Sequence, residues 1–476
     1  MPNVHNVVCT IILLNNIGEC GKIKKGDETM ELPFQIIEVL ERLENAGFAA
    51  FVVGGCVRDF LMGMTPHDFD ITTSALPKET EGVFADCRVI ETGIKHGTVT
   101  VLYKGMSTEI TTFRTDGNYS DGRHPDSVSF SRNIEDDLSR RDFTMNGIAY
   151  SPKRGFVDPF GGQADIKSGI IRSIGDPDKR FSEDELRVLR ALRFSAVLGF
   201  SIEEKTCQAV HQHKNKLRKV SSERIFAELS RLLCGKDVKR VLLDFSEIFS
   251  EIIPPLGAEI GYEQGSKYHN STLYEHTARA VEAAPDTVEM RFAMLFHDLG
   301  KPSCRSVGED GECHYYGQGE VSAKMADEIM RALKCGNSLR EQVVEIVKYH
   351  DIPVETSRKY IRRQLAKHGL EMFTAIMNAH IADDSAKYDF CRERIPKVRE
   401  AIVAAEQISA ESSCLSMKSL VISGNDLREI VPPSPLMGKI LEKLLEETVD
   451  EKIPNEKSAL LKRAAELKEI LSRQDN

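Results

Sequence analysis

The chain has 476 residues, a formal net charge of −10, 41% hydrophobic and 29% charged residues, and 11 scattered cysteines. This length exceeds what one hydrophobic core supports, so we expect three or more domains. No apolar run approaches the length of a membrane span, and the absence of CxxC spacing argues against a zinc ribbon or a disulfide scaffold, which favours a reducing cytoplasm. The acidic balance by itself argues against a nucleic-acid partner, because phosphate binding needs cations.

The first elements of the chain are an unpatterned segment and a helix. Residues 1–29 match no periodicity and are expected to be a disordered extension. From Met30 the pattern predicts an amphipathic helix that Gly47 ends. Its apolar face consists of Ile36, Ile37, Leu40 and Leu43.

Strand patterns then dominate from Phe48 to Tyr150, and helical patterns dominate from Glu183 to nearly the end. The expected strands are residues 51–53, 69–72, 98–103, 107–113 and 128–130. The sequence therefore predicts an α+β head, a small mixed or antiparallel sheet with helices, followed by a long all-α body.

The head combines a glycine turn with acidic residues. The run Val52-Val53-Gly54-Gly55 predicts a strand leading into a helix, where backbone N–H groups suit a triphosphate. Asp68 and Asp70, two apart on a predicted strand, share a face and favour a bound cation such as Mg²⁺. Glu109 is a candidate third carboxylate. An ordinary turn and a solvated Glu109 are the simpler alternatives.

Five motifs follow one another along the head and beyond it. They are Gly54-Gly55-x-x-Arg58-Asp59 with His67-Asp68-Phe69-Asp70-Ile71, Arg140-Arg141-Asp142-Phe143-Thr144-Met145-Asn146, Asp158-Pro159-Phe160-Gly161-Gly162, Glu183-Asp184-x-x-Arg187 and Ser222-Glu223-Arg224-Ile225. In this order they resemble the class II tRNA nucleotidyltransferases and their bacterial poly(A) polymerase relatives. The resemblance implies catalysis by Asp68, Asp70 and Glu109 with two Mg²⁺ ions, which activate a primer 3′-hydroxyl and stabilise the leaving pyrophosphate.

The resemblance also implies a set of nucleotide-binding residues. They are Gly54, Gly55, Arg58, Arg140, Arg141, Asp142, Asn146, Asp184, Arg187 and Arg190. The arginines at 140 and 141 suit triphosphate oxygens, and Asp142 suits a ribose hydroxyl. Asp184 and Arg187, three apart on a predicted helix, would offer one acceptor and one donor to the pairing edge of cytosine or adenine. A surface salt bridge is the simpler alternative.

The loop from Asp116 to Pro125, with Asp121 and Arg123, resembles the loop that full CCA-adding members use to switch from C to A. It implies CTP and ATP as substrates and the tRNA 3′ end as acceptor. A poly(A) polymerase or an A-only adding enzyme remains the alternative within the same class.

A second pattern lies in the helical body. His276, His297-Asp298 and Asp383 resemble the ligand order of HD-type metal phosphohydrolases, which implies a second divalent metal: Mg, Mn, Ni, Fe or Zn. Gln318 stands where that family usually has histidine, so His314 and His350 are further candidates. The alternative for this site is a degenerate metal site kept for structure. Two alternatives for the whole protein are an HD-type phosphohydrolase with an RNA-binding head and a catalytically dead RNA-binding module.

These observations divide the chain into five expected segments. They are an extension (1–29), a nucleotidyltransferase head (30–162), a helical neck with nucleotide-selecting and RNA-binding motifs (163–260), an HD-type helical domain (261–390) and a C-terminal helical tail (391–476) that the resemblance places on the tRNA elbow. The basic cluster at residues 358–363 is either an RNA contact or a solvated helix face.

Overall fold

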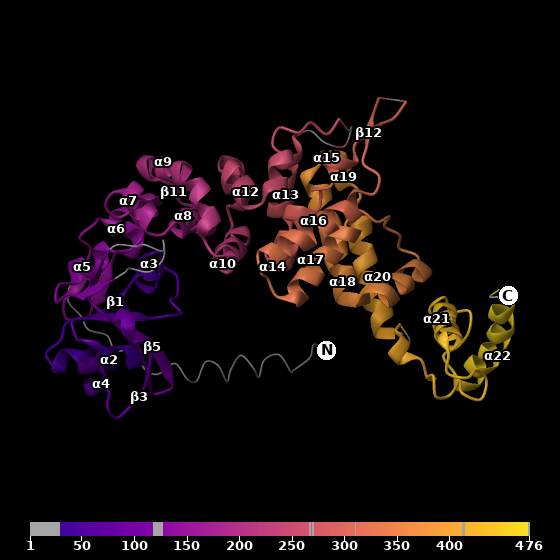
Figure 1. Ribbon diagram of the computed structural model, residues 1–476, viewed down its shortest axis with the longest axis horizontal. Helices are drawn as coiled ribbons and strands as arrows, with labels where there is room; N and C mark the ends of the chain where they lie inside the picture. The colour runs from indigo at the N-terminus through magenta and orange to yellow at the C-terminus, as the bar shows by residue number, and fades with distance from the viewer. Residues whose placement is uncertain are drawn as a thin grey trace. The chain divides into compact units, whose positions relative to one another are not determined.

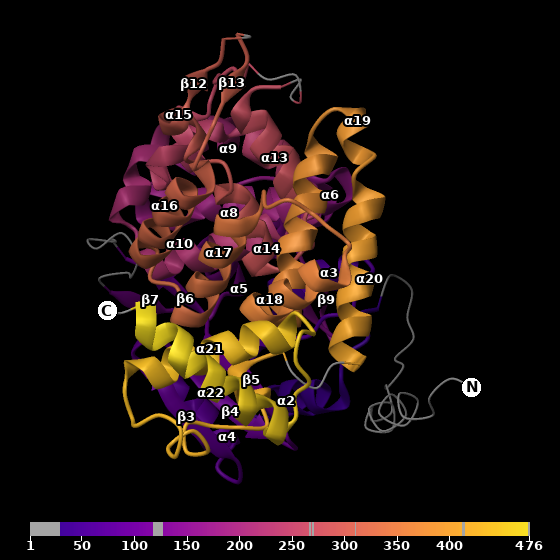
Figure 2. The ribbon, with the colours of Figure 1, turned by 90° about the vertical axis from the view of Figure 1, so that its right-hand side faces the viewer.

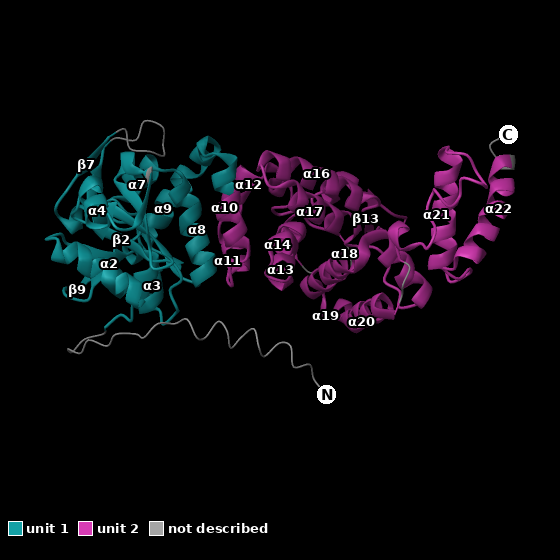
Figure 3. Ribbon diagram, turned by 90° about the horizontal axis from the view of Figure 1, so that it is seen from below, with its two compact units in different colours: residues 1–225 teal, residues 226–476 magenta. Residues whose placement is uncertain are grey.

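The computed structural model describes residues 29–117, 127–265, 268, 271–309, 311–411 and 415–474. The chain divides into two compact units, which meet in sequence between Ile225 and Phe226 (Figure 3). A sheet with helices occupies the first unit, and the second is almost wholly helical (Figure 1), so the predicted fold class is confirmed. Within these described ranges, no helix combines the length and the apolar character needed to cross a membrane.

A seven-stranded mixed sheet forms the centre of the first unit. Its order is β3 (Arg88–Gly93), β4 (Thr98–Tyr103), β5 (Met106–Thr112), β2 (Asp70–Thr73), β1 (Ala50–Val53), β8 (Ala149–Ser151) and β9 (Gly155–Val157). Strands β2 and β5 run parallel, and every other neighbouring pair is antiparallel. All four residues of β1 are buried, and because side chains alternate between the two faces, both faces of this strand are covered.

Most predicted strands are confirmed, with one difference in pairing. The segments predicted at 51–53, 69–72, 98–103 and 107–113 correspond to β1, β2, β4 and β5. The segment at 128–130 is β7 (Val128–Phe130), but β7 pairs with β6 (Arg114–Asp116) outside the large sheet. Strands β3, β8 and β9 were not predicted.

The first helix begins later than predicted. Helix α2 runs from Phe34 to Asn45 rather than from Met30, and Pro33 before it has extended backbone angles. Because a proline disfavours helical geometry in the residue before it, the segment ahead of Pro33 cannot join the helix. Gly47, with a φ of 91°, follows the end of the helix as predicted.

Short helices surround the sheet and continue the unit. They are α3 (Gly55–Leu61), α4 (Pro77–Val83), α5 (Ile134–Ser139), α6 (Gly162–Ser168), α7 (Pro177–Glu183), α8 (Leu186–Leu198) and α9 (Glu204–His213), with β10 (Ile170–Ile171) pairing with β11 (Ser201–Ile202). Helix α10 (Ser222–Leu233) spans the boundary between the two units. Helix α2 packs against β1 and α4 against β4. Helix α8 is buried on most of its surface, and the ring of its Phe194 meets Phe143 edge-on at 5.8 Å.

The second unit is a set of packed helices. They are α11 (Val238–Asp244), α12 (Ser246–Ile252), α13 (Leu273–Ala283), α14 (Val288–Phe296), α15 (Lys301–Cys304), α16 (Gln318–Ala332), α17 (Asn337–Tyr349), α18 (Arg358–Ala386), α19 (Asp389–Arg392), α20 (Ile395–Glu411), α21 (Pro435–Val449) and α22 (Lys457–Gln474), with the hairpin β12 (Ser306–Val307) and β13 (Cys313–His314). Helices α18 and α20 lie side by side (Figure 2). Contacts among α13, α14, α17 and α18 gather the polar cluster described below.

Two hydrophobic cores stabilise the later part of this unit. One joins α18 to α20 through residues such as Phe373 and Ile408. The other, with Leu444 and Leu460, joins α21 to α22. The boundaries predicted at residues 162, 260 and 390 stay predictions.

Candidate functional site

The glycine turn of the head connects β1 to α3. Gly54 has a φ of 81°, a conformation that side-chain-bearing residues rarely adopt, and its N–H donates to the Ile148 carbonyl. A Cβ at Gly54 would lie 3.0 Å from Nη1 of Arg141. The missing side chain therefore leaves the space in which the Arg141 guanidinium lies against the turn.

The two predicted catalytic carboxylates lie next to this turn, but one strand does not carry both. Asp70 begins β2, whereas Asp68 precedes the strand, so the prediction that a shared strand aligns them is wrong. Both side chains are exposed at the surface. The neighbouring protein still reduces the hydration of Asp70 and raises its pKa; the Arg141 guanidinium opposes this rise and the Asp68 charge adds to it.

The register of the sheet brings Glu109 to the same edge. Strands β2 and β5 pair Ile71 with Ile110, so Asp70 and Glu109 stand one residue earlier on two adjacent parallel strands. Side chains at equivalent positions of neighbouring strands point to the same face. This register agrees with Glu109 as a third carboxylate, a role that stays a prediction.

A fully buried carboxylate that the sequence analysis missed holds both predicted phosphate-binding arginines. Asp137 of α5 accepts from Nε and Nη2 of Arg140 at 2.9 and 2.8 Å, and from Nη2 of Arg141 at 3.4 Å. It also accepts from the Thr72 hydroxyl of β2 at 3.2 Å. The spacing of three and four residues between Asp137 and the arginines was the available signal.

Asp142 is the centre of a second polar network. Its Oδ1 accepts from the Phe143 N–H and from Nδ2 of Asn146, and its Oδ2 accepts from Nε and Nη2 of Arg190. Asn146 in turn accepts from Nη1 of Arg58 at 2.9 Å. Burial alone would raise the pKa of Asp142, but Arg190 and Asn146 hold this pKa well below its ordinary value. The network brings together four of the predicted nucleotide-binding residues.

The predicted base-selecting residues Asp184 and Arg187 do not share one helix. Asp184 has extended backbone angles after the end of α7, and α8 begins at Leu186, so the expected i,i+3 helical pairing is wrong. Oδ1 of Asp184 accepts from the Leu186 N–H at 3.1 Å, and its backbone carbonyl accepts from the Arg187 N–H at 3.0 Å. Its Oδ2 accepts from Nη2 of Arg224 on α10 at 2.8 Å. Asp184 thus caps α8 while α10 fixes its carboxylate.

Arg187 is nearly buried, and protein oxygens hold its guanidinium. Its Nη1 donates to the Arg180 carbonyl at 3.1 Å and to Oε2 of Glu183 at 3.0 Å, and its Nη2 donates to the Arg140 carbonyl at 3.1 Å. The last bond connects the predicted base-selecting segment to the predicted phosphate-binding motif.

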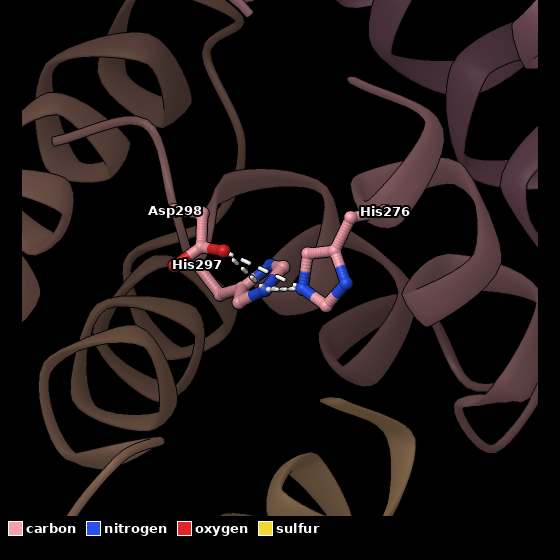
Figure 4. A group of neighbouring side chains, drawn as sticks. All are labelled: His276, His297 and Asp298. Carbon is pink, nitrogen blue, oxygen red and sulfur yellow. Dashed lines mark hydrogen bonds and ion pairs between the residues drawn. The ribbon is translucent and has the colours of Figure 1, made fainter. Parts of the chain in front are cut away.

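The second unit contains a buried cluster of imidazole and carboxylate groups (Figure 4). His276 comes from α13, His297 from the end of α14, and Asp298 follows directly. Nε2 of His276 lies 3.2 Å from Nε2 of His297, which lies 3.1 Å from Oδ2 of Asp298. Nitrogen and oxygen donors that converge in this way form a candidate metal centre.

Three further charged groups face this cluster. Oδ1 of Asp383 on α18 lies 3.1 Å from Nε2 of His276. The ammonium groups of Lys301 and Lys387 lie 2.7 Å from Asp298 and 2.5 Å from Asp383. Burial lowers the pKa of His276 to about 4, against the opposing effect of the Asp383 carboxylate. The four residues with HD-type order are therefore brought together.

Of the two further metal-ligand candidates, one lies in the cluster and the other does not. His350 lies in the cluster, 3.9 Å from Oδ1 of Asp298, whereas His314 lies on β13 and stacks on the Tyr316 ring at 5.5 Å. The predicted switching-loop residues Asp121 and Arg123 lie outside the described residues.

The fold and site of the head are those of a nucleotidyltransferase, and comparison with known families agrees. Residues 50–172 match the family model of the poly A polymerase head domain. Residues 199–258 match the RNA- and SrmB-binding site of polymerase A, and residues 318–464 match tRNA nucleotidyltransferase domain 2. The class of the protein is therefore nucleotidyltransferase.

Similarity to full-length proteins narrows this class. The chain is 35% identical to a CCA-adding enzyme of Lactobacillus delbrueckii subsp. bulgaricus over 90% of this chain and 96% of the relative. It is 33% identical to a CCA-adding enzyme of Geobacillus stearothermophilus over the same shares. The crystal structure of the Bacillus stearothermophilus CCA-adding enzyme in complex with CTP superimposes with a TM-score of 0.68 at 31% identity, covering 93% of this chain and 98% of that one. The chain belongs to the CCA-adding enzyme family of tRNA nucleotidyltransferases.

Proposed function

We propose that this chain completes or repairs the 3′-terminal CCA of tRNA with CTP and ATP and releases pyrophosphate. The observation that carries the proposal is the arrangement of Asp68 and Asp70 beside the Arg141 guanidinium at the Gly54 turn. Carboxylates for metal ions next to a cation for phosphate oxygens are what phosphoryl transfer requires. The complex of a relative with CTP supports the nucleotide substrate, and the full-length relatives favour CCA addition over poly(A) or A-only synthesis.

Magnesium fits the carboxylate pair of the head. Asp68 and Asp70 offer exposed carboxylate oxygens, the donor that Mg²⁺ prefers, and Asp68 raises the pKa of Asp70, a repulsion that a dication relieves. Glu109 is the candidate third ligand. Two such ions would activate the 3′-hydroxyl of the tRNA and stabilise the leaving pyrophosphate.

The side chains around this pair have separate tasks in the proposal. Arg140 and Arg141, held by Asp137, bind triphosphate oxygens. The network of Asp142, Asn146 and Arg58 forms the ribose side of the site.

Donor and acceptor capacity supports the proposed base selection. Each carboxylate oxygen of Asp184 makes one hydrogen bond within the protein, so each retains a lone pair for an amino group of cytosine or adenine. Arg187 uses three of its five N–H groups on protein oxygens, which leaves two for a ring nitrogen. A base with the reversed pattern would leave these partly buried groups unpaired.

The test of the main proposal uses purified protein, a tRNA that lacks CCA, and each labelled nucleotide supplied separately or together. Asp68→Ala and Asp70→Ala should each abolish incorporation while tRNA binding persists, because metal-held carboxylates act on chemistry rather than docking. Asp86→Ala, which removes an exposed carboxylate elsewhere in the head, is the matched control. Near-parental turnover in either variant would refute the assignment, and a product of adenosines alone would refute CCA addition.

We propose a second function for the imidazole and carboxylate cluster of the second unit: it is a metal phosphohydrolase centre. Its two imidazoles and two carboxylates suit Mn, Ni, Fe or Zn as well as Mg, so a divalent metal fits His276, His297, Asp298 and Asp383. Such an ion would lower the pKa of a bound water and supply a nucleophile. Lys301 and Lys387, both against the carboxylates, would orient an anionic phosphate ester.

The test is phosphatase and cyclic-phosphodiesterase activity after loading with each divalent metal. His297→Ala should lose both the bound metal and the hydrolysis, while His314→Ala, a histidine outside the cluster, should keep them. Thermal unfolding of each variant confirms that it is folded. Hydrolysis that survives in folded His297→Ala would refute this second function.

A further inference from the structure

His350 meets the His297 ring edge-on at 5.1 Å, but it approaches a different oxygen of the Asp298 carboxylate from the other two imidazoles. Oδ2 of Asp298 lies 3.1 Å from Nε2 of His297 and 3.5 Å from Nε2 of His276. Oδ1 of the same carboxylate faces Nε2 of His350 at 3.9 Å. Because the two oxygens face different imidazoles, this carboxylate has the geometry to bridge two neighbouring metal ions.

His297 and His350 are built in the same way. Each directly follows a helix, α14 or α17, and each donates from Nδ1 to the carbonyl three residues earlier: Met294 at 2.8 Å and Val347 at 2.7 Å. A carbonyl only accepts, so Nδ1 carries the proton in both rings and Nε2 presents its lone pair to the cluster. The backbone therefore prepares both imidazoles equally well as ligands.

Gln318 makes the difference between these two histidines. Its Nε2 donates to Nε2 of His350 at 3.1 Å, and its Oε1 accepts from the Ser322 hydroxyl at 3.1 Å. Ser322 in turn accepts from the Gly300 N–H at 2.9 Å. These bonds form a chain from the Gly300 N–H, which can only donate, to the Val347 carbonyl, which can only accept. The two ends fix the direction of each bond between them, so the Gln318 amide N–H occupies the Nε2 lone pair of His350.

The charges of the cluster also favour one bound ion over two. Asp298 and Asp383 are buried, and the ammonium groups of Lys301 and Lys387 already lie against them. One divalent ion therefore leaves an excess of positive charge among these groups. A second ion would add two more charges to a nearly solvent-free site. The Asp351 carboxylate next to His350 is exposed to solvent and offsets these charges only weakly, so a second ion is costly.

We propose that this cluster holds a single metal ion, bound by His276, His297, Asp298 and Asp383, and that Gln318 excludes a second ion by occupying Nε2 of His350. This inference rests on the metal centre of the second proposed function. Gln318 is a positioning residue in this account, because it acts through His350.

The test counts ions rather than turnover. It uses the full chain with Asp68→Ala and Asp70→Ala, so that the head carboxylates contribute no bound metal, equilibrated with Mn²⁺ and measured by equilibrium dialysis, elemental analysis and electron paramagnetic resonance. The parent should bind one ion per chain with the spectrum of isolated Mn²⁺, and His297→Ala should bind none. Gln318→Glu, which keeps the shape of the side chain but supplies a carboxylate, should bind two ions with an exchange-coupled spectrum.

Two control variants distinguish a failure of the single-ion inference from a failure of the metal centre. Gln208→Glu, the same change at an exposed position of α9, and His350→Ala should both keep one ion. No ion in the folded parent would overturn the metal centre itself. Three outcomes would overturn the single-ion inference but not the metal centre. They are two ions in the parent that are both lost in His297→Ala, only one ion in Gln318→Glu, and loss of the ion in His350→Ala.

Discussion

Asp137 holds the two arginines that we propose for binding the triphosphate. One buried carboxylate receives three hydrogen bonds from Arg140 and Arg141 and a fourth from Thr72. Charge-assisted bonds of this kind fix the direction of long arginine side chains, which otherwise keep many rotamers. Asp137 thus sets where the two cations lie before a nucleotide arrives.

We predict that Asp137→Asn raises the KM for CTP more than it lowers kcat. A hydrogen bond to a charged group contributes about 1.5–3 kcal/mol, so the loss should be about tenfold or more in kcat/KM. Asp136→Asn, one residue earlier and bonded to the Ser131 hydroxyl, is the matched control and should keep the parental KM. The measurement is steady-state CTP incorporation together with thermal unfolding. A folded Asp137→Asn protein with an unchanged KM would contradict the positioning role.

Among the elements, the junction of α7 and α8 carries the two proposed base-selecting residues, and a third helix, α10, holds one of them, Asp184. Asp184 caps α8 with one oxygen, and Arg224 of α10 holds the other oxygen. The Asp184 carboxylate is therefore oriented by the Leu186 N–H at the start of α8 and by Arg224 of α10.

We predict that Arg224→Ala lowers the selectivity for CTP and ATP over UTP and GTP nearly as much as Asp184→Ala does. The reason is that a carboxylate held only by the Leu186 N–H can rotate away from the base. Single-turnover incorporation of each nucleotide measures this, with Arg231→Ala, an exposed arginine on α10, as control. If Arg224 acts through Asp184, the double variant should lose no more selectivity than Asp184→Ala alone; additive losses would mean that the two act separately.

The first half of α18 anchors the C-terminal helices, which gives the basic cluster at residues 358–363 a structural role. Arg362 is buried and donates to the Val449 and Thr448 carbonyls at the end of α21. Arg363 makes two bonds of 2.7 Å to the Asp450 carboxylate at the surface. The Arg362 guanidinium thus supplies donors to carbonyls of the last turn of α21.

We predict that Arg362→Ala loosens α21 far more than Arg363→Ala does. Loss of the buried donor leaves two helix-end carbonyls without it, at a cost of about 1–3 kcal/mol. Arg363 is half-exposed, and without it Asp450 keeps its ion pairs with Lys359 and Lys452. Hydrogen exchange of α21 and α22 in the full chain is the measurement, and added salt should mimic Arg363→Ala only. Equal protection in both variants would argue against this difference.

At the scale of the whole molecule, the two candidate sites lie in different compact units, and we predict that they work independently. His297→Ala should remove metal from the second unit without changing CTP and ATP incorporation, and Asp68→Ala should have the opposite effect. Metal content and nucleotide incorporation are measured on the same preparations. Loss of both properties in one folded variant would mean that the sites are coupled.

The sequence by itself determined the class of the protein and the residues of each motif. The members of each motif are close in the chain, so their spacing can be recognised without the fold. Examples are Gly54 with Gly55, Asp68 with Asp70, and Arg140 to Asp142. Most strands were predictable because residue alternation depends on neighbours in sequence. The apolar pattern from Met30 predicts too early a start for α2, because Pro33 disfavours helical geometry in the residue before it.

Only the tertiary structure decided which of these side chains hold one another. Asp142 meets Arg190 across 48 residues, and Asp184 meets Arg224 across 40 residues. The pairing of Gln318 with His350 likewise depends on the packing of α16 against α17. Residue spacing carries no information on such contacts, because side chains far apart in the chain meet only once helices and strands have packed. The motifs were therefore predictable from the sequence, whereas the contact of Asp184 with Arg224 and the end of α7 before Asp184 emerged only from the fold.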